Sequence, residues 1–343
     1  MKRSLIFFGL FLLAWSGRIL AQSPAQKVQT VTVGIPGVVQ RGATIELVKD
    51  GLAGADDPIG LPDGSLLFTE PNANRVSKLG NDNRITTFIE KTNAGLGMSM
   101  DSQGRLIQAQ SADGQTKIAV IFPRGSERVI GDNYNGRPFS RPNDLIVDRK
   151  GGVYVTDPGL TGTNVQQMQQ AQGGKPLAPR LPPAVYYIPA SPAGGEPVRI
   201  ADGIERPNGI TLSPDERTLY VNNTNGIYML AFDVQPDGTV RNRRNIGPFE
   251  GRSQTPNGIP GIMTGADGLT IDAAGRLYAV TSAGIEIFTP EGKPLGVIRM
   301  SCGGMDCQGL AFAGPEKRTL YIAGRGSLWK IEMLAKGFTG RAK

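Results

Sequence analysis

The hydrophobic and polar positions of this chain repeat as one short unit. The unit is a turn built from Asp, Pro, Gly or a charged pair, then a small or basic residue, then an apolar or aromatic run typical of a β-strand. Its six copies lie at residues 62–68, 102–107, 149–154, 215–220, 273–278 and 316–321. The apolar runs begin at residues 66, 106, 153, 219, 277 and 320, so successive repeats are 40, 47, 66, 58 and 43 residues apart.

Repeats of this length suit one four-stranded sheet each, and helical periodicity is nearly absent from the chain. We therefore predict an all-β protein in which residues 44–333 form a six-bladed β-propeller rather than two domains. A large β-sandwich or barrel would explain the strands but not the repeat.

The two ends of the chain lie outside the repeats. Residues 1–21 resemble a secretory signal peptide, with Lys2 and Arg3, an apolar run over 5–15 and a cleavage site before Gln22. We expect a periplasmic or secreted protein without a membrane span once the signal is removed; an uncleaved anchor is the less favoured alternative because the run is short. Residues 22–43 are predicted to be an extended lead-in, 45–48 can join the last blade and close the ring, and 334–343 are a C-terminal tail.

The segment 159–186 breaks the repeat with Gln-rich and Pro-rich sequence, and we expect it to leave its blade as a surface loop.

The net charge of the chain is +7, with acidic and basic residues interspersed. Removing residues 1–21 deletes Lys2, Arg3 and Arg18 and lowers it to +4. This charge is weak evidence for nucleic acid or an anionic membrane as a partner, and we expect a solvated surface of mixed charge with no nucleic-acid partner.

The chain contains no histidine. Ser-His-Asp and Cys-His nucleophiles, His-ligated zinc and a His general base are therefore excluded. Cys302 and Cys307 are close together, and in an oxidising compartment a local disulfide is favoured over free thiols or half a metal site. Chemistry must come from carboxylates, amides, Arg, Lys or a metal held by oxygen.

Polar residues precede the strand in several repeats. Asn143, Asn208 and Asp267 hold equivalent places in three of them, and Asp56 holds a comparable place ahead of the first. The first strand of every propeller blade lines the central channel, so these side chains are predicted to converge. Two amide oxygens and two carboxylates form a site for Ca²⁺, or less favourably Mg²⁺ or Mn²⁺. The alternative is that Pro-Asn-Gly and Ala-Asp-Gly are only turns.

Arg141 lies two residues before Asn143, so both side chains point to the same face of an extended segment. A cation beside the ion suits an anionic or carbonyl-bearing substrate. Arg206 has the same relation to Asn208, and a salt bridge with a rim carboxylate is the alternative role for Arg141.

Four stretches carry a resemblance to a known family. They are 134–159 with Ser-Arg-Pro-Asn-Asp-Leu, 206–221 with Arg-Pro-Asn-Gly-Ile-Thr-Leu, 265–287, and 310–315. From about residue 44 to 332 the sequence resembles the SMP-30/gluconolactonase/LRE family of regucalcin-like lactonases. The resemblance implies a six-bladed propeller with one catalytic divalent ion, usually calcium, that hydrolyses sugar-acid or related lactones. By position it implies Asn208 and Asp267 as metal ligands, Asp267 also as general base, and Arg141 and Asn143 as substrate-binding groups.

The sequence departs from the family pattern at three places. Asp56-Asp57-Pro58 stands where a Glu is usual, Ala109-Gln110 where Glu-His is frequent, and Gln308 where Asn is common. These changes bear on the substrate more than on the metal.

We therefore predict an exported metal-dependent hydrolase of lactones or related small esters. Asp56, Asn208 and Asp267 would hold the ion, most favourably Ca²⁺ with Zn²⁺, Mg²⁺ or Mn²⁺ as alternatives. The ion would polarise the carbonyl, with Asp267 or a bound water as base or nucleophile. The alternative is a non-catalytic propeller that binds a small ligand or a protein and keeps a structural Ca²⁺. A condensing or rearranging enzyme has less support, because such systems generally use a His or Glu base.

Overall fold

The computed structural model describes residues 28–111, 115–160, 165–166, 169–170, 173–174, 180–191, 194–254, 262–302 and 307–343. The predicted signal peptide at 1–21 lies outside these residues, as do parts of the predicted 159–186 loop. No helix in these ranges is long and apolar enough to cross a membrane.

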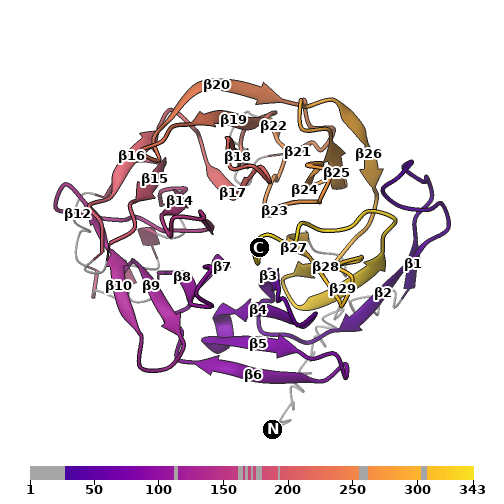
Figure 1. Cartoon of the computed structure of the whole chain (residues 1–343), viewed down its shortest axis with the longest axis horizontal. Helices are drawn as coiled ribbons and strands as arrows, with labels where there is room; N and C mark the ends of the chain where they lie inside the picture. Colours follow the sequence, from indigo (N-terminus) through magenta and orange to yellow (C-terminus); the bar gives the residue numbers. More distant parts are fainter. Residues whose placement is uncertain are drawn as a thin grey trace, which may run out of the picture.

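The described strands form blades arranged in a closed ring (Figure 1). Each of the first five blades is a four-stranded antiparallel sheet, numbered outward from the centre. They are β3 (Asp56–Gly60), β4 (Leu66–Glu70), β5 (Arg75–Leu79) and β6 (Ile85–Glu90); β7 (Met98–Met100), β8 (Leu106–Gln110), β9 (Lys117–Phe122) and β10 (Arg128–Gly131); β13 (Leu145–Val147), β14 (Val153–Asp157), β15 (Ala184–Ile188) and β16 (Val198–Ala201); β17 (Pro207–Leu212), β18 (Thr218–Asn223), β19 (Met229–Val234) and β20 (Val240–Ile246); β23 (Leu269–Ile271), β24 (Leu277–Thr281), β25 (Gly284–Phe288) and β26 (Pro294–Ile298).

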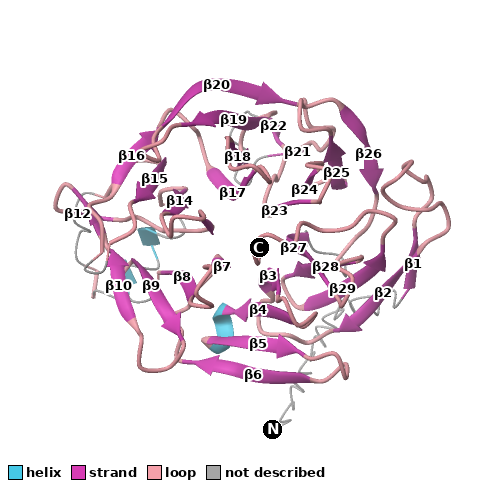
Figure 2. Ribbon diagram, in the orientation of Figure 1, coloured by secondary structure: helices cyan, strands magenta, loops and turns pink. Residues whose placement is uncertain are grey.

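The sixth blade combines the two ends of the chain. Its sheet order is β1 (Val28–Thr30), β2 (Thr44–Lys49), β29 (Ser327–Glu332), β28 (Thr319–Gly324) and β27 (Cys307–Ala313). Ile45 pairs with Ile331, which confirms that residues 45–48 close the ring. Smaller elements are β11 (Asn133–Tyr134) with β12 (Arg137–Pro138), β21 (Ser253–Gln254) with β22 (Ile262–Met263), and the short helix η1 (Pro71–Ala73). Strands dominate the described fold (Figure 2), and the prediction of an all-β six-bladed propeller is confirmed.

The repeated turn has a common physical basis in its aspartate. In the fifth blade, Asp272 Oδ1 accepts hydrogen bonds from the main-chain N–H groups of Ala274 and Arg276, both at 2.9 Å, and Arg276 Nε donates to Oδ2 at 2.6 Å. Asp101 and Arg105 repeat this arrangement in the second blade. The apolar run that follows forms the second strand, which is buried along its whole length in β4, β8, β14 and β24 because it lies between neighbouring blades.

The predicted tail, residues 334–343, packs across the turns that join the first and second strands. Gly337 bridges to Asp272 and Ala342 to Met100, in different blades. Arg341 Nη2 donates to Ser213 O at 2.7 Å. Lys343, the last residue, lies near the centre of the ring (Figure 1) and is paired with Asp144.

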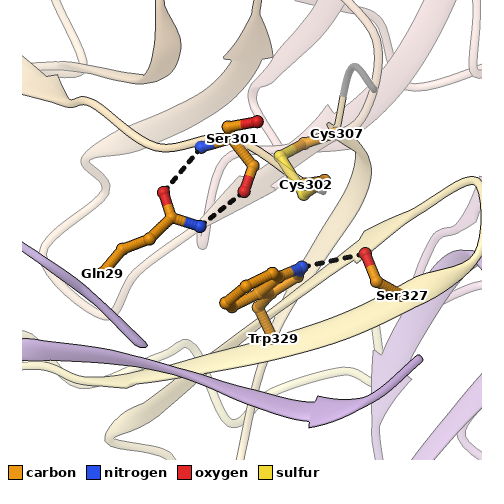
Figure 3. Close-up of a disulfide and its surroundings, with 6 residues drawn as sticks. All are labelled: Gln29, Ser301, Cys302, Cys307, Ser327 and Trp329. Atoms are coloured by element: carbon orange, nitrogen blue, oxygen red, sulfur yellow. Dashed lines mark hydrogen bonds between the residues drawn. A yellow bond between two sulfur atoms is a disulfide. The ribbon is translucent and has the colours of Figure 1, made fainter. Parts of the chain in front are cut away.

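Cys302 and Cys307 form the predicted disulfide, with a Cα–Cα distance of 5.2 Å (Figure 3). The adjacent Ser301 exchanges two hydrogen bonds with Gln29, which precedes β2: Gln29 Nε2 donates to Ser301 O at 2.6 Å and Ser301 N donates to Gln29 Oε1 at 2.9 Å. The connection that leads into β27, and so to Gln308, is therefore tied to β1, which pairs with the ring-closing strand β2.

Candidate functional site

Hydrogen bonds between neighbouring blades place the predicted polar residues at equivalent positions around the centre. The main-chain carbonyl of Asn143 accepts from Gly97 N at 2.8 Å, that of Asp267 from Gly209 N at 3.1 Å, and that of Gln308 from Gly268 N at 2.7 Å. The Asn208 carbonyl accepts from Thr156 Oγ1 at 2.8 Å. Each of these residues is thus held by the blade before it.

Glycines make this close approach possible. A Cβ atom on Gly209 would lie 2.3 Å from Asp267 O, and one on Gly268 would lie 2.6 Å from Gln308 O. Asn208 and Gly209 belong to strand β17, and neither glycine has a positive φ. The alternative interpretation of Pro-Asn-Gly and Ala-Asp-Gly as turns is therefore wrong: the glycine is required for contact between the innermost segments of adjacent blades.

Four carboxylates gather at the centre of the ring. Burial raises the pKa of Asp56 to about 6, and the negative charge of Asp144 adds to this effect. Burial, then the charges of Asp144 and Asp56, raise the pKa of Asp57 well above its usual value. Burial and the charge of Asp56 do the same for Asp267. The predicted residues Asp56 and Asp267 are therefore close enough for their charges to interact, and the charge of Asp144 acts on both.

Asp57 and Asp144 were not predicted as part of the site. Asp57 directly follows Asp56 and adopts a φ of 36°, in the left-handed region that a non-glycine residue rarely occupies. Asp144 follows Asn143 and is almost fully buried. Each of the two residues directly follows a predicted site residue in the sequence. This adjacency is the signal that could have identified them.

Asp144 connects blades rather than facing open space. Its Oδ1 accepts from Leu145 N at 2.7 Å and its Oδ2 from Ile210 N at 2.9 Å, in the next blade. Lys343 Nζ also donates to Oδ1, and its side chain is buried. No repeat or motif marks Lys343, so sequence reasoning could not have placed it here.

Arg141 and Asn143 lie on a segment that is fixed by Asp157. Ser140 N donates to Asp157 Oδ2 at 2.6 Å and Arg141 N to Oδ1 at 3.0 Å. The positive charge of Arg141 acts on both Asp56 and Asp267. Within the described part of the chain Arg141 forms no salt bridge, so the rim salt bridge considered for it is not formed there.

The donors at the centre fit a divalent ion that prefers oxygen. Asp56 and Asp267 supply carboxylates, and Asn208 donates through Nδ2 to Thr224 Oγ1 at 3.2 Å, which leaves its amide oxygen available. Among the described residues no three acidic, His or Cys side chains form a metal-binding group by themselves, so a site here would need an amide oxygen in addition to carboxylates. Burial and mutual repulsion raise the pKa values of these carboxylates, and a bound cation would stabilise their ionised form. Carboxylate and amide oxygens, completed by water, are ligands that suit Ca²⁺.

Comparison with known proteins gives the family and relatives of this chain. A model of the SMP-30/Gluconolactonase/LRE-like region matches residues 59–325. A gluconolactonase from Zymomonas mobilis is 28% identical over 314 residues, which cover 87% of this chain and 83% of that protein. A solved structure of a gluconolactonase from Xanthomonas campestris is 26% identical with a TM-score of 0.69, covering 91% of this chain and 99% of that one. The calcium-binding protein regucalcin from Agrobacterium tumefaciens, 16% identical with a TM-score of 0.62 over 85% of this chain and 94% of its own, shares the fold.

Proposed function

Because this chain belongs to the SMP-30/Gluconolactonase/LRE-like family, we propose that it hydrolyses lactones or related small esters at the centre of its ring. The observation that carries the proposal is the buried carboxylate of Asp267, on which the charges of Asp56 and Arg141 act and whose main chain is bonded to Gly209, the neighbour of Asn208. These residues come from different blades.

Asp267 acts as the general base in this proposal. In the metal-free protein, burial and the charge of Asp56 raise its pKa, which makes the carboxylate a stronger base there than an exposed Asp; a bound cation lowers this pKa. It removes a proton from the water that attacks the carbonyl carbon, and it returns that proton to the ring oxygen when the ester C–O bond breaks. The product is the open hydroxy acid.

Arg141 and Asn143 orient the substrate. Both are half-buried, and the contacts of Asp157 to the main chain fix the segment that carries them. Asp56, Asn208 and Asp267 would hold a divalent ion, with Ca²⁺ favoured, which supplies polarisation of the carbonyl and stabilisation of the developing negative charge.

Hydrolysis of aldonolactones with and without chelator tests the proposal. We expect chelation to abolish activity and Asp267→Asn to lower kcat by about 10²- to 10⁴-fold. Asp237→Asn is the matched control, because Asp237 is exposed in the turn between β19 and β20. Activity that is unchanged by chelation and by Asp267→Ala would overturn the proposal.

A non-catalytic binding role is the second candidate. The observation that favours it lies in the second blade, where Ala109-Gln110 stands in place of Glu-His. Ala109 is fully buried and Gln110 Nε2 donates to Gln108 Oε1 at 3.3 Å, so strand β8 has no Glu-His pair that could act as acid and base. Tight calcium binding without turnover of any lactone or ester in a broad panel would support this role instead.

We also propose that the protein is exported to the periplasm or secreted, with residues 1–21 removed. The local disulfide supports an oxidising compartment. Mass spectrometry of the mature protein should find Gln22 at the N-terminus, whereas an intact Met1 would contradict cleavage.

A further inference from the structure

Three arginines from three blades lie close enough to the acidic centre for their charges to act on it; Arg141 and Arg206 are half-buried and Arg325 is exposed. Arg141 precedes β13, Arg206 directly precedes β17, and Arg325 lies in the turn between β28 and β29. In that turn Gly324 pairs with Cys307, the neighbour of Gln308, so Arg325 is at the same end of the ring as the candidate site. The charges of Arg141 and Arg325 both act on Asp56, and those of Arg141 and Arg206 both act on Asp267.

These arginines lack partners in the described structure. None of the three forms a salt bridge with a described residue, whereas Arg75, Arg105 and Arg276 each pair with a carboxylate at 2.6 to 2.8 Å. The Nε of Arg206 is buried and has no hydrogen-bond partner among the described atoms. An unsatisfied buried donor is costly, and the cost is greater for a charged group.

The main chain holds Arg206 in this position. Its N–H donates to Asn223 Oδ1 at 3.1 Å, and its carbonyl accepts from Thr224 N at 3.0 Å. Pro207 follows and restricts the backbone further. Burial and the positive charges of Arg141 and Arg325 lower the pKa of Arg206, so the fold keeps three mutually repelling cations together.

The arginine side chains leave room for an anion. Among the described residues no salt bridge neutralises any of the three guanidinium groups, although the charge of Arg141 acts on Asp56, Asp157 and Asp267. An anion would also satisfy the buried Nε of Arg206. The planar guanidinium groups suit a carboxylate or a phosphate, which they can bind through two parallel hydrogen bonds.

We propose that Arg206 and Arg325, beside Arg141, form an anion-binding subsite, so that the preferred lactone carries a carboxylate or phosphate group remote from its ester. The inference rests on the proposed lactonase function and assigns its substrate class. Arg206 and Arg325 are the specificity-determining residues of this subsite.

A set of lactones with matched rings tests the subsite. Gluconolactone ends in a neutral hydroxymethyl group, glucarolactone in a carboxylate and phosphogluconolactone in a phosphate ester. We expect kcat/KM to be at least about 10-fold higher for one of the two anionic lactones than for gluconolactone, and the better of the two identifies the anion. Arg206→Met and Arg325→Met should each lower that ratio by about 10-fold, and Arg206→Lys should restore part of it.

Arg217→Met is the matched control, because its side chain is 87% exposed in a turn between β17 and β18. It should leave the ratio unchanged. Equal kcat/KM for all three lactones, or a ratio that Arg206→Met and Arg325→Met do not change, overturns the inference.

Binding of the open-chain acids separates this inference from the lactonase proposal. Calorimetry with glucarate, phosphogluconate and gluconate in the presence of calcium needs no turnover. Stronger binding of one of the first two, weakened by Arg206→Met and Arg325→Met, supports the subsite even if no lactone is hydrolysed. Hydrolysis of gluconolactone with equal binding of all three acids overturns the subsite and leaves the lactonase proposal standing.

Discussion

Asp56 shows how the surroundings of one residue determine its chemistry. The same side chain on the surface would ionise well below neutral pH, but burial first, and then the charge of Asp144, raises its pKa to about 6. A proton or a metal ion can relieve the same crowding of negative charge. The raised pKa of Asp56 and the expected affinity of the centre for a cation therefore have the same cause, which is the burial of several carboxylates near one another.

This cause predicts how stability depends on pH in metal-free protein. Because the folded pKa of Asp56 is about 6 and its ordinary value is 3.8, the folded state retains a proton between these pH values that the unfolded state has lost. The contribution of Asp56 to the free energy of unfolding is therefore fully present below about pH 4 and is lost as the pH rises through about 6. Asp56→Asn should match the parent protein near pH 4 and be more stable near pH 8.

Urea denaturation in chelator at the two pH values measures this difference. Added calcium is the control: at the higher pH it should stabilise the parent protein more than the variant. A stability difference that is the same at both pH values would contradict the assigned environment of Asp56.

Gly268 offers a second test at the residue scale. A Cβ atom at this position would lie 2.6 Å from Gln308 O in the next blade, so Gly268→Ala should lower the free energy of unfolding by about 2 kcal/mol. Gly326→Ala is the matched control, since its nearest neighbour would be Leu52 O at an ordinary 3.6 Å, and it should cost less than about 0.5 kcal/mol. Equal effects in thermal or urea denaturation would show that the contact between blades is not tight.

Repetition made some of the central residues predictable. Asn208 and Asp267 stand in phrases that recur before a strand, and this recurrence indicated a shared position around the axis. The same argument could not identify Arg325 or Lys343. Arg325 lies in a hairpin turn and Lys343 in the segment after β29, and neither belongs to a repeated sequence pattern. The reason for the glycines was also missed, since their close contacts involve residues 58 and 40 positions away in the chain, Gly209 with Asp267 and Gly268 with Gln308.

At the scale of the elements, a disulfide holds the connection that leads into β27. The bond between Cys302 and Cys307 closes a short loop directly before Gln308, and Gln29 holds the adjacent Ser301. A loop of this size accounts for about 2 kcal/mol of stability through the entropy of the unfolded chain. Replacing both cysteines by serine should lower the free energy of unfolding by about that amount.

Chemical denaturation with and without reductant measures the effect. Reductant should destabilise the parent protein and leave the double variant unchanged. Parent and variant of equal stability under oxidising conditions would show that the disulfide makes no net contribution.

The strands themselves were predictable because each repeat contains its own turn. An aspartate that binds main-chain N–H groups, as Asp272 and Asp101 do, fixes the turn from residues close in sequence, and the apolar run after it becomes the buried second strand. The outer strands carry a weaker signal. In β20 most residues are exposed, including Arg243 and Arg244, because only one edge of that strand is paired and the strand borders solvent.

At the scale of the whole molecule, two terminal segments hold the ring together. Strand β2 completes the sixth blade by pairing with β29, and residues 334–343 cross the turns of several blades. The charge of Lys343 lowers the pKa of Asp57 at the centre, so this segment also influences the candidate site. Closure of the fold and the electrostatics of the site are therefore linked.

The ion pair between Lys343 and Asp144 makes this link measurable. Both side chains are almost fully buried, and removing one partner of a buried pair leaves an uncompensated charge. Lys343→Met should therefore lower the free energy of unfolding by about 3 kcal/mol, while Lys330→Met, whose pair with Glu46 at 3.3 Å is solvent-accessible, should cost less than about 1 kcal/mol. Combining Lys343→Met with Asp144→Asn should cost about 1 to 3 kcal/mol less than the sum of the single changes, because the lone buried charge is then gone. Strictly additive losses in urea denaturation would mean that the two residues do not interact, and that residues 334–343 are attached to the ring through Arg341 and main-chain contacts instead.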